Sequence, residues 1–489
     1  MVCPEARACS FARESLMPVG SSKAGTRYRA ILRHELSSLP QIQALDADER
    51  LAMLAVSAVL PFRVNQYVIE ELIDWDDIPD DPIYQLTFPQ RAMLAPEDHL
   101  VMQDLVRRDA HPDELQAAAR KIRYRLNPQP DGQKEYNVPC YQGEPIQGMQ
   151  HKYHDTVLYF PRQGQTCHAF CTYCFRWAQF IGEKDLRFRS SDTERFHAYL
   201  CEHRKVRDLL FTGGDPMVMR SKHLRAYIEP LLGPGFEHVQ HIRIGTKAIA
   251  WWPYRFVHGE EADDFLRLLE EIRAAGKLPA IMGHFSHPVE LSTDIARRAI
   301  RRIQSAGGVI RTQAPLVRHV NDSSSVWEEL WNTQVTLGCI PYYMFVARDT
   351  GPREFFRVPL ARALRIYQRA YRKVSGLART VRGPVMSALP GKALLTGVME
   401  LHGKRLFSLQ LIRGRKPSWE RRPFHARYDE EAAWLTDLKP AFGEREFFYW
   451  KELQQLLEPG QDRNWLKISE EHVGNHPDPH ELQDRLENR

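Results

Sequence analysis

Residues 164–176 read GQTCHAFCTYCFR, and the three cysteines in this stretch decide which fold the surrounding chain is expected to adopt. Cys167, Cys171 and Cys174 follow a C-x3-C-x2-C spacing, so their sulfurs can turn toward one point from a tight loop. Thiolates grouped in this way suit an iron–sulfur cluster. Because the group has no fourth cysteine, a 4Fe–4S cluster held here keeps one iron open to a small molecule.

An open iron can chelate the amino and carboxylate groups of S-adenosylmethionine, which brings the sulfonium close enough to receive an electron from the reduced cluster. The spacing therefore predicts reductive cleavage of S-adenosylmethionine. Two alternatives remain open. A structural zinc site needs four ligands, and His168 is a poor fourth because it directly follows Cys167. Disulfide bonds would leave one cysteine of the three over.

The amino-acid composition limits the kinds of protein that this chain can be. The 489 residues are 43% hydrophobic and 26% charged, as in an ordinary soluble globular protein. Basic and acidic residues number 67 and 62, so the net charge of +5 is weak evidence for a polyanion partner. Eight cysteines are too sparse for a disulfide scaffold, which predicts a reducing, cytoplasmic location. No apolar run reaches about 18 residues, so no membrane span is expected.

The N-terminal part of the chain is predicted to be a leader followed by helices. Residues 1–27 mix acidic and basic side chains without an apolar core, which predicts a disordered leader. Residues 28–150 are predicted to form a helical region that ends in an extended connector over residues 127–150. Apolar positions spaced by three and four predict helices over residues 28–36, 46–59 and 99–126, the last interrupted at Pro112.

Short apolar runs alternate with amphipathic segments across residues 151–392. The runs predict strands over residues 157–160, 208–212, 241–245, 280–285, 309–313 and 340–346. The segments predict helices near residues 191–205, 221–232, 262–275, 293–305, 323–337 and 359–373. Six such units favour a parallel sheet, and right-handed crossovers wind it toward a barrel. The predicted fold class is α/β: a partial (β/α)6 TIM-like barrel with a helical N-terminal region and a C-terminal extension.

Polar and glycine residues gather where the predicted strands end, which is the edge at which parallel barrels carry their chemistry. The cysteine loop follows the first strand and Gly213-Gly214-Asp215-Pro216 follows the second, while His284 and Gln313 end the fourth and fifth. The glycine pair leaves backbone carbonyls free for a ligand ammonium, although read alone it is an ordinary turn. His284 could equally be a satisfied polar residue at a strand end.

Two cations near these edges are candidates for binding. Arg176 lies two residues past the last cysteine and can grip a substrate carboxylate in a bidentate fashion; an ion pair with a nearby acid is the alternative. Lys392 follows a turn and can form a Schiff base with pyridoxal phosphate, although most lysines are solvated surface charges.

Taken together, these residues resemble the lysine 2,3-aminomutase family of radical S-adenosylmethionine enzymes. The resemblance runs from about Pro61 to Gly414 and implies a radical S-adenosylmethionine barrel over residues 151–392 that includes the cofactor lysine. It implies that a 5′-deoxyadenosyl radical takes a hydrogen from the β-carbon of an amino acid held as an aldimine of pyridoxal phosphate, after which the nitrogen migrates from the α- to the β-carbon. An electron donor such as a flavodoxin or ferredoxin is implied as a partner.

The resemblance assigns roles position by position. Cys167, Cys171 and Cys174 hold the cluster, Arg176 holds the substrate carboxylate and Lys392 carries pyridoxal phosphate, while the nucleoside site is lined by Gly213, Gly214, Asp215, His284 and Gln313. The matching stretches also include HKY at 151–153, RIG at 243–245, HFSHP at 284–288, VND at 320–322 and PYY at 341–343.

Departures from the family pattern bear on the substrate and on pyridoxal phosphate. The two acidic residues that hold the amino groups of lysine in lysine-specific members fall on Arg348 and Val385, with Asp349 adjacent to the first. A cation at this place should repel a lysine side chain and attract an acidic one, which argues against lysine as the substrate. Among the phosphate-holding positions only Lys152, which stands at a family arginine, keeps a cation.

The C-terminal part, residues 393–489, begins with a predicted β-hairpin around His402 and Gly403 and continues into an accessory extension. Beyond Gly414 the resemblance ends. Interleaved basic and aromatic residues there could contact RNA, but a packed lid is the more frequent explanation.

The sequence therefore predicts a cytoplasmic amino-acid 2,3-aminomutase that acts on a small-molecule amino acid. One alternative is a radical S-adenosylmethionine enzyme that acts on another carboxylate-bearing substrate without pyridoxal phosphate. The other is a non-catalytic iron–sulfur or nucleic-acid-binding protein. The sequence does not indicate an oligomeric state.

Overall fold

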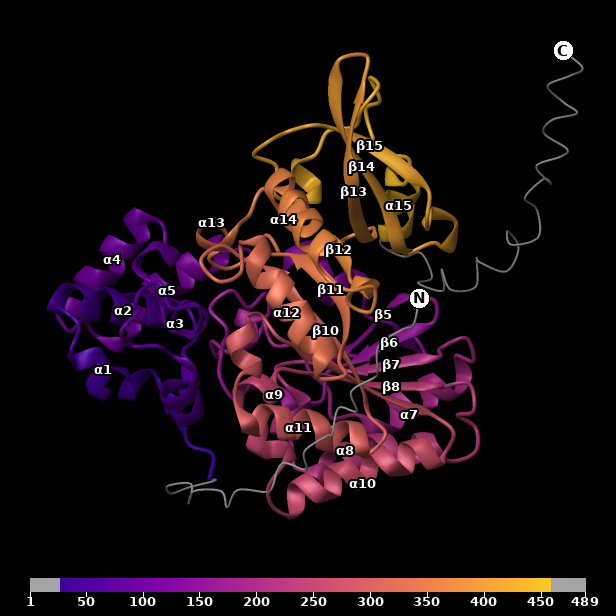
Figure 1. Cartoon of the computed structure of the whole chain (residues 1–489), viewed down its shortest axis with the longest axis horizontal. Helices are drawn as coiled ribbons and strands as arrows, with labels where there is room; N and C mark the ends of the chain where they lie inside the picture. Colours follow the sequence, from indigo (N-terminus) through magenta and orange to yellow (C-terminus); the bar gives the residue numbers. More distant parts are fainter. Residues whose placement is uncertain (1–26, 459–489) are drawn as a thin grey trace, which may run out of the picture.

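One sheet of eleven strands runs through most of the chain in the computed structural model, which describes residues 27–458 (Figure 1). Its strand order is β15-β14-β13-β12-β11-β10-β9-β8-β7-β6-β5, so neighbouring strands follow one another along the chain. Seven consecutive strands are parallel. They are β6 (Thr156–Tyr159), β7 (Asp208–Phe211), β8 (His241–Thr246), β9 (Leu278–His284), β10 (Val309–Leu316), β11 (Ile340–Val346) and β12 (Arg382–Ala388).

Helices connect the parallel strands. They include α7 (Thr193–Glu202), α8 (Ser221–Ile228), α10 (Glu260–Ala274), α11 (Asp294–Ser305), α12 (Ser324–Thr336) and α14 (Leu360–Lys373). In α11 the buried residues Ala296, Ala299, Ile300 and Ile303 recur at spacings of three and four, which gives the helix one apolar face. The predicted α/β class is confirmed, and each of the six predicted strands is present.

The parallel run contains one strand more than the six predicted. Strand β12 reads RGPVMSA, and its glycine and proline hide the short apolar run that would have marked it. It pairs with β11 through Tyr343 and Phe345. This seventh parallel strand leads directly into the turn before Lys392.

Antiparallel strands continue the sheet at both edges. Strand β5 (Met149–Tyr153) pairs with β6, and β13 (Gly391–Leu401), β14 (Lys404–Gly414) and β15 (Pro423–Arg427) follow β12. The β13–β14 hairpin projects from the top of the molecule in Figure 1. Its turn residues His402 and Gly403 both have positive φ, as two-residue hairpin turns require.

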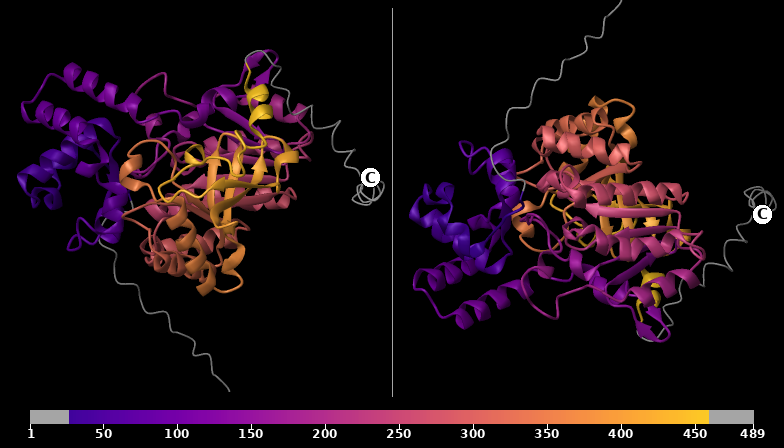
Figure 2. Two further views of the ribbon diagram at one scale, coloured as in Figure 1. Left: turned by 90° about the horizontal axis from the view of Figure 1, so that it is seen from above. Right: turned by 90° about the horizontal axis from the view of Figure 1, so that it is seen from below.

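Helices of the N-terminal region form one end of the molecule (Figure 2). The predicted helices are confirmed in α2 (Ala47–Val59) and in α4 (Pro96–Arg107) and α5 (Pro112–Arg125), which are separated before Pro112. The helix predicted over residues 28–36 is wrong. That segment forms β1 (Ala30–Leu32) and the 3-10 helix η1 (Arg33–Ser38), because β1 pairs with β2 (Arg63–Asn65) and this tertiary pairing overrides a short helical pattern.

The connector and the chain ends complete the described part. The connector holds α6 (Gln133–Tyr136) and the short strands β3 (Cys140–Tyr141) and β4 (Glu144–Pro145). Apart from Arg27, the leader predicted over residues 1–27 lies outside the described residues. Within residues 27–458 no helix is both long and apolar enough to cross a membrane.

The C-terminal extension has a core of its own under the hairpin. Phe407, Trp419, Trp434 and Tyr449 are buried there, and α15 (Trp450–Leu457) packs Leu453 against them. The aromatic residues that suggested RNA contact in the sequence are therefore partly core residues of this extension.

Candidate active site

The cysteine loop leaves β6 and is held by backbone hydrogen bonds from the N-terminal region. Phe170 N–H donates to the Arg63 carbonyl and Thr172 N–H donates to the Leu86 carbonyl, each at 2.8 Å. The Arg63 guanidinium also donates to Thr166 Oγ1 at 2.9 Å. These bonds fix the path of the loop and leave Cys167, Cys171 and Cys174 as free thiols, which removes the disulfide interpretation.

The three thiols lie close enough to influence one another. Burial raises the pKa of each, and the charge of a neighbouring cysteine of the group raises those of Cys167 and Cys174 further, the latter to about 12. Three such thiols ionise together only around a positive group, which an iron–sulfur cluster supplies. Among the described residues, no three His, Cys, Asp or Glu side chains gather at the spacing of a single metal ion. An iron–sulfur cluster needs its cysteine sulfurs farther apart than a single metal ion does, because each thiolate binds a separate iron.

The glycine pair after β7 is locked against the cysteine loop. A Cβ added to Gly214 would lie 2.4 Å from the Thr166 carbonyl oxygen, and one added to Gly213, whose φ is +146°, would lie 2.1 Å from Gln165 Nε2. Asp215 N–H donates to the Gly164 and Thr166 carbonyls at 3.0 and 2.7 Å. The cysteine loop and the turn at Gly213 to Asp215 are thus in backbone contact. Both were predicted at the edge of the sheet where the parallel strands end, and we call this edge the rim.

Asp215 positions this turn with its side chain. The carboxylate is almost fully buried and accepts hydrogen bonds from Thr246 Oγ1, Lys247 N–H and Met217 N–H at 2.7 to 2.9 Å. Burial raises its pKa to about 6. Because its oxygens are occupied by the protein, the side chain holds β7 and β8 together, and the neighbouring glycine backbone is the part of this turn suited to a ligand.

A buried polar network links the cysteine loop to β8 and β9. Tyr173 Oη lies 2.7 Å from His284 Nε2 and 3.0 Å from Ser286 Oγ. Lys247 Nζ donates to the fully buried Glu290 at 2.6 Å and to Ser286 Oγ at 3.3 Å. Burial lowers the pKa of His284 well below its usual value, so its ring is neutral.

Lys247 and Glu290 were not predicted as members of this network. Each follows the end of a predicted strand. A charged residue at such a place could have marked it as a candidate for the site. Gln313, which was predicted, pairs in register with His284 across β10 and β9, so these two candidates are neighbours.

Lys392 lies in aromatic and cationic surroundings. Its Nζ sits 4.8 Å and 4.7 Å from the ring centres of Tyr343 and Phe345 on β11. Burial, together with the charges of Arg243, Arg348, Arg413 and Arg382, lowers the pKa of Lys392 to about 7. The preceding Gly391 is required, since a Cβ there would lie 2.0 Å from the Arg413 carbonyl oxygen.

These surroundings fit pyridoxal phosphate. An amine that is partly neutral near pH 7 is a competent nucleophile, and the surrounding guanidinium groups suit a phosphate. Lys152 is close enough to Lys392 for each charge to disfavour the other, but its ammonium donates to the Ala388 carbonyl. Arg415, buried beside Lys152, extends the cationic cluster.

Arg176 is a half-buried cation without an acidic partner among the described residues. Its guanidinium lies over the rings of Phe160 and Phe175, at 4.3 and 5.0 Å from their centres. Burial lowers its pKa to about 10. The alternative of an internal ion pair is therefore absent from the described part of the chain, and the guanidinium can take a carboxylate.

Comparisons with known proteins find L-lysine 2,3-aminomutases among the relatives of this chain. No protein-family model matches the chain. A putative L-lysine 2,3-aminomutase of Aquifex aeolicus is 28% identical over 362 residues, which cover 74% of this chain and 84% of the relative. The L-lysine 2,3-aminomutase of Methanococcus maripaludis is 22% identical, covering 68% of this chain and 66% of that protein. Over about two thirds or more of its length, the chain is therefore similar to L-lysine 2,3-aminomutases.

Other relatives cover less of the chain. The L-lysine 2,3-aminomutase of Fusobacterium nucleatum is 28% identical over 242 residues, and the match spans 49% of this chain and 53% of that protein. A solved radical S-adenosylmethionine methyltransferase, TsrM from Kitasatospora setae, is 11% identical with a TM-score of 0.28, covering 40% of this chain and 37% of that one.

Arg348 and Val385 stand where lysine-specific relatives are expected to have acidic residues, and the two side chains lie in different surroundings. The Arg348 side chain is mostly buried and forms an ion pair with Asp131 from the connector. The Val385 side chain is fully buried in an apolar cluster with Tyr343 and Ile412. Asp131 was missed because it lies 217 positions from Arg348 and no motif marks it. Asp131 therefore offsets part of the positive charge that Arg348 brings to this place.

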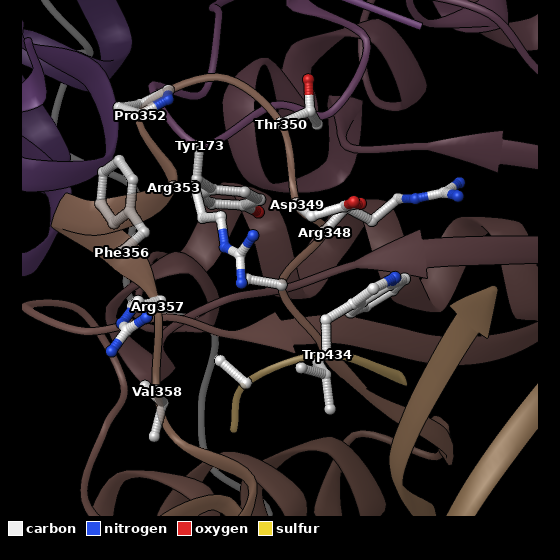
Figure 3. A pocket seen from close by; sticks show the side chains of 13 residues that line it. Tyr173, Arg348, Asp349, Thr350, Pro352, Arg353, Phe356, Arg357, Val358 and Trp434 are labelled. Carbon is white, nitrogen blue, oxygen red and sulfur yellow. The ribbon is translucent and has the colours of Figure 1, made fainter. Parts of the chain in front are cut away.

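A narrow cleft lies between the cysteine loop and the C-terminal extension (Figure 3). Tyr173 lines it from the loop, Arg348 and Asp349 line it from the segment after β11, and Trp434 lines it from the extension. Arg348 also lies 5.6 Å from the Phe175 ring, whose other contact is Arg176. The Phe175 ring thus lies between Arg348, which lines the cleft, and the guanidinium of Arg176.

Proposed function

We propose that this chain is a radical S-adenosylmethionine aminomutase that moves an amino group from Cα to Cβ of an amino acid other than lysine. The observation that carries the proposal is the position of Arg348. Its charge influences the pKa values of both Arg176 beside the cysteine loop and Lys392 on β13, so these two groups flank one region.

Each group in that region supports a separate part of the reaction. A cluster on Cys167, Cys171 and Cys174 together with S-adenosylmethionine supplies a 5′-deoxyadenosyl radical, and pyridoxal phosphate supplies a conjugated ring to the substrate amine. Arg176 holds the substrate carboxylate, which aims one C–H bond toward the cysteine loop. Lys392, whose pKa is lowered to about 7, would hold pyridoxal phosphate as the lysine that carries it.

The remaining parts of the protein serve this site. The glycine backbone at Gly213 and Gly214, with His284 and Gln313, forms the nucleoside site, and Lys152 contributes positive charge near the phosphate. We also propose that the parallel strands curve into a partial barrel, since an in-order parallel sheet with right-handed crossovers keeps its helices on one face. The enzyme acts in the cytoplasm and receives electrons from a flavodoxin or ferredoxin.

A second candidate function is radical chemistry without pyridoxal phosphate. It is favoured by one contact, because the Lys152 ammonium donates to the Ala388 carbonyl and is thereby drawn away from a phosphate. The substrate would then be another small carboxylate-bearing molecule.

The test is reconstitution under anaerobic conditions. With dithionite, the protein should form 5′-deoxyadenosine from S-adenosylmethionine, and the absorbance of bound pyridoxal phosphate should disappear in Lys392→Ala. The matched control is Lys404→Ala, an exposed lysine on the neighbouring strand β14. Deuterium transfer from a panel of labelled amino acids into 5′-deoxyadenosine identifies the substrate. If Lys392→Ala keeps pyridoxal phosphate, the aminomutase proposal is wrong, and if no 5′-deoxyadenosine forms, both radical functions are wrong.

A further inference from the structure

Three residues that line the cleft of Figure 3 each carry a buried polar atom without a hydrogen-bond partner in the described part of the chain: Nε of Arg348, Oδ1 of Asp349 and Nε1 of Trp434. The Trp434 side chain is only 1% exposed. A buried polar atom left without a hydrogen bond costs about 1–3 kcal/mol. Three such atoms on one cleft therefore indicate a molecule that supplies the missing partners.

Trp434 is held in place by its own loop. The Asp437 carboxylate accepts hydrogen bonds from the N–H groups of Ala433 and Trp434 at 3.0 Å and pairs with Arg353 at 3.1 Å. Leu360 N–H donates to the Ala432 carbonyl at 2.8 Å, which ties the loop to α14. The indole is therefore a fixed wall of the cleft, and it comes from the part of the chain where the resemblance to the family has ended.

The cleft lies next to the place proposed for the substrate carboxylate. Tyr173, one residue before Cys174, lines it. Arg348 lies over Trp434 at 5.8 Å and over Phe175 at 5.6 Å, and Phe175 in turn contacts Arg176. An amino acid whose carboxylate is held by Arg176 can therefore extend its side chain toward Trp434.

We infer that Trp434, Arg348 and Asp349 bind the end of the substrate side chain, and that this end is a carboxamide. The inference rests on the proposed function for the placement of the substrate. Two N–H donors, on Trp434 and Arg348, match the oxygen of a carboxamide, and the free oxygen of Asp349 matches its NH₂ group. A terminal ammonium has no acceptor oxygen and leaves both N–H donors unpaired, so a lysine side chain matches the site less well than a carboxamide.

The Trp434 indole N–H reports binding directly, without turnover. In protein with ¹⁵N-labelled tryptophan, prepared anaerobically with its cofactors, its NMR signal is assigned as the one that disappears in Trp434→Phe. The probes are L-glutamine, L-glutamate, L-norleucine and L-lysine. The signal should shift saturably with L-glutamine and stay in place with L-norleucine and L-lysine. A shift with L-glutamate but not L-glutamine overturns the carboxamide assignment, and no shift with any probe, or an equal shift with L-norleucine, overturns the site.

A variant measures the contribution of the indole donor. Trp434→Phe keeps the aromatic wall and removes the N–H, so the Kd for L-glutamine should rise about tenfold. Trp450→Phe, an exposed tryptophan on α15, should leave that Kd unchanged. An unchanged Kd in Trp434→Phe contradicts the inference. Failure of the proposed function is seen separately, as absence of 5′-deoxyadenosine from the wild-type protein with every amino acid.

Discussion

The rim that carries the cysteine loop and the cleft that ends at Trp434 are built in different ways. At the rim, backbone meets backbone: the turn at residues 213–215 and the loop at residues 164–174 are joined through N–H and carbonyl groups, and glycines are required where they touch. In the cleft, side chains from the cysteine loop, the segment after β11 and the C-terminal extension meet, and three of their polar atoms have no hydrogen-bond partner among the described residues. Backbone contacts at the rim tolerate few substitutions. The side chains of the cleft can be replaced singly, so a few substitutions there can alter which ligand binds.

The largest expected effect is at the rim, with Gly214→Ala. The added Cβ would lie 2.4 Å from the backbone oxygen of Thr166, and backbone cannot give way as a flexible side chain can. We expect loss of cluster assembly, measured as iron and sulfide per chain. Gly376→Ala is the control, because nothing lies within 4 Å of its added Cβ. Full iron content in Gly214→Ala would show that the two segments are not locked together.

The buried pair of Lys247 and Glu290 should give the next largest effect. Lys247→Met leaves a fully buried carboxylate without its partner, which should lower the free energy of unfolding by about 3–5 kcal/mol in denaturant titration. The double variant Lys247→Met/Glu290→Leu should recover much of that loss. Lys373→Met, which breaks an exposed pair with Glu328, should cost less than about 1 kcal/mol. Equal losses for the buried and the exposed pair would contradict this account of the rim.

A change in the cleft should alter selectivity and leave the rim intact. Asp131→Asn removes the charge that offsets Arg348, so binding of L-glutamate relative to L-glutamine should increase about tenfold, measured from the Kd values. Iron content should not change. Asp80→Asn, at an exposed aspartate, serves as the control. If the ratio does not move, Asp131 has no part in selecting the substrate.

The smallest predicted effect is a pH dependence at Lys392. Because its pKa in the folded protein is lowered to about 7, the unfolded chain binds more protons between pH 7 and the usual lysine pKa. The contribution of Lys392 to stability is therefore unfavourable below about pH 7 and improves as pH rises above it. Covalent capture of pyridoxal phosphate, trapped with borohydride, should likewise increase as pH rises through about 7 and then level off. A capture profile centred near pH 10 would mean that the lysine is solvated.

The rim could be predicted from the sequence to a greater extent than the cleft. Strands β6 to β11 and the contact between the cysteine loop and Gly214 follow from local patterns, because each motif stands directly after an apolar run. The pairing of Arg348 with Asp131 and the position of Trp434 in the cleft depend on segments far apart in the sequence. No sequence spacing marks these contacts. The segment at residues 30–38 was mispredicted for the same reason, since pairing with β2 decides its conformation.

The most direct measurement of the central claim is the iron and sulfide content of the anaerobically reconstituted protein, followed by 5′-deoxyadenosine formation with dithionite. We predict about four irons per chain in the wild type, and loss of both iron and product when Cys167, Cys171 or Cys174 is replaced by serine. Cys201→Ser, at an exposed free cysteine, should behave as the wild type. Wild-type protein that binds no iron and sulfide, or serine variants that still form 5′-deoxyadenosine, would contradict the account.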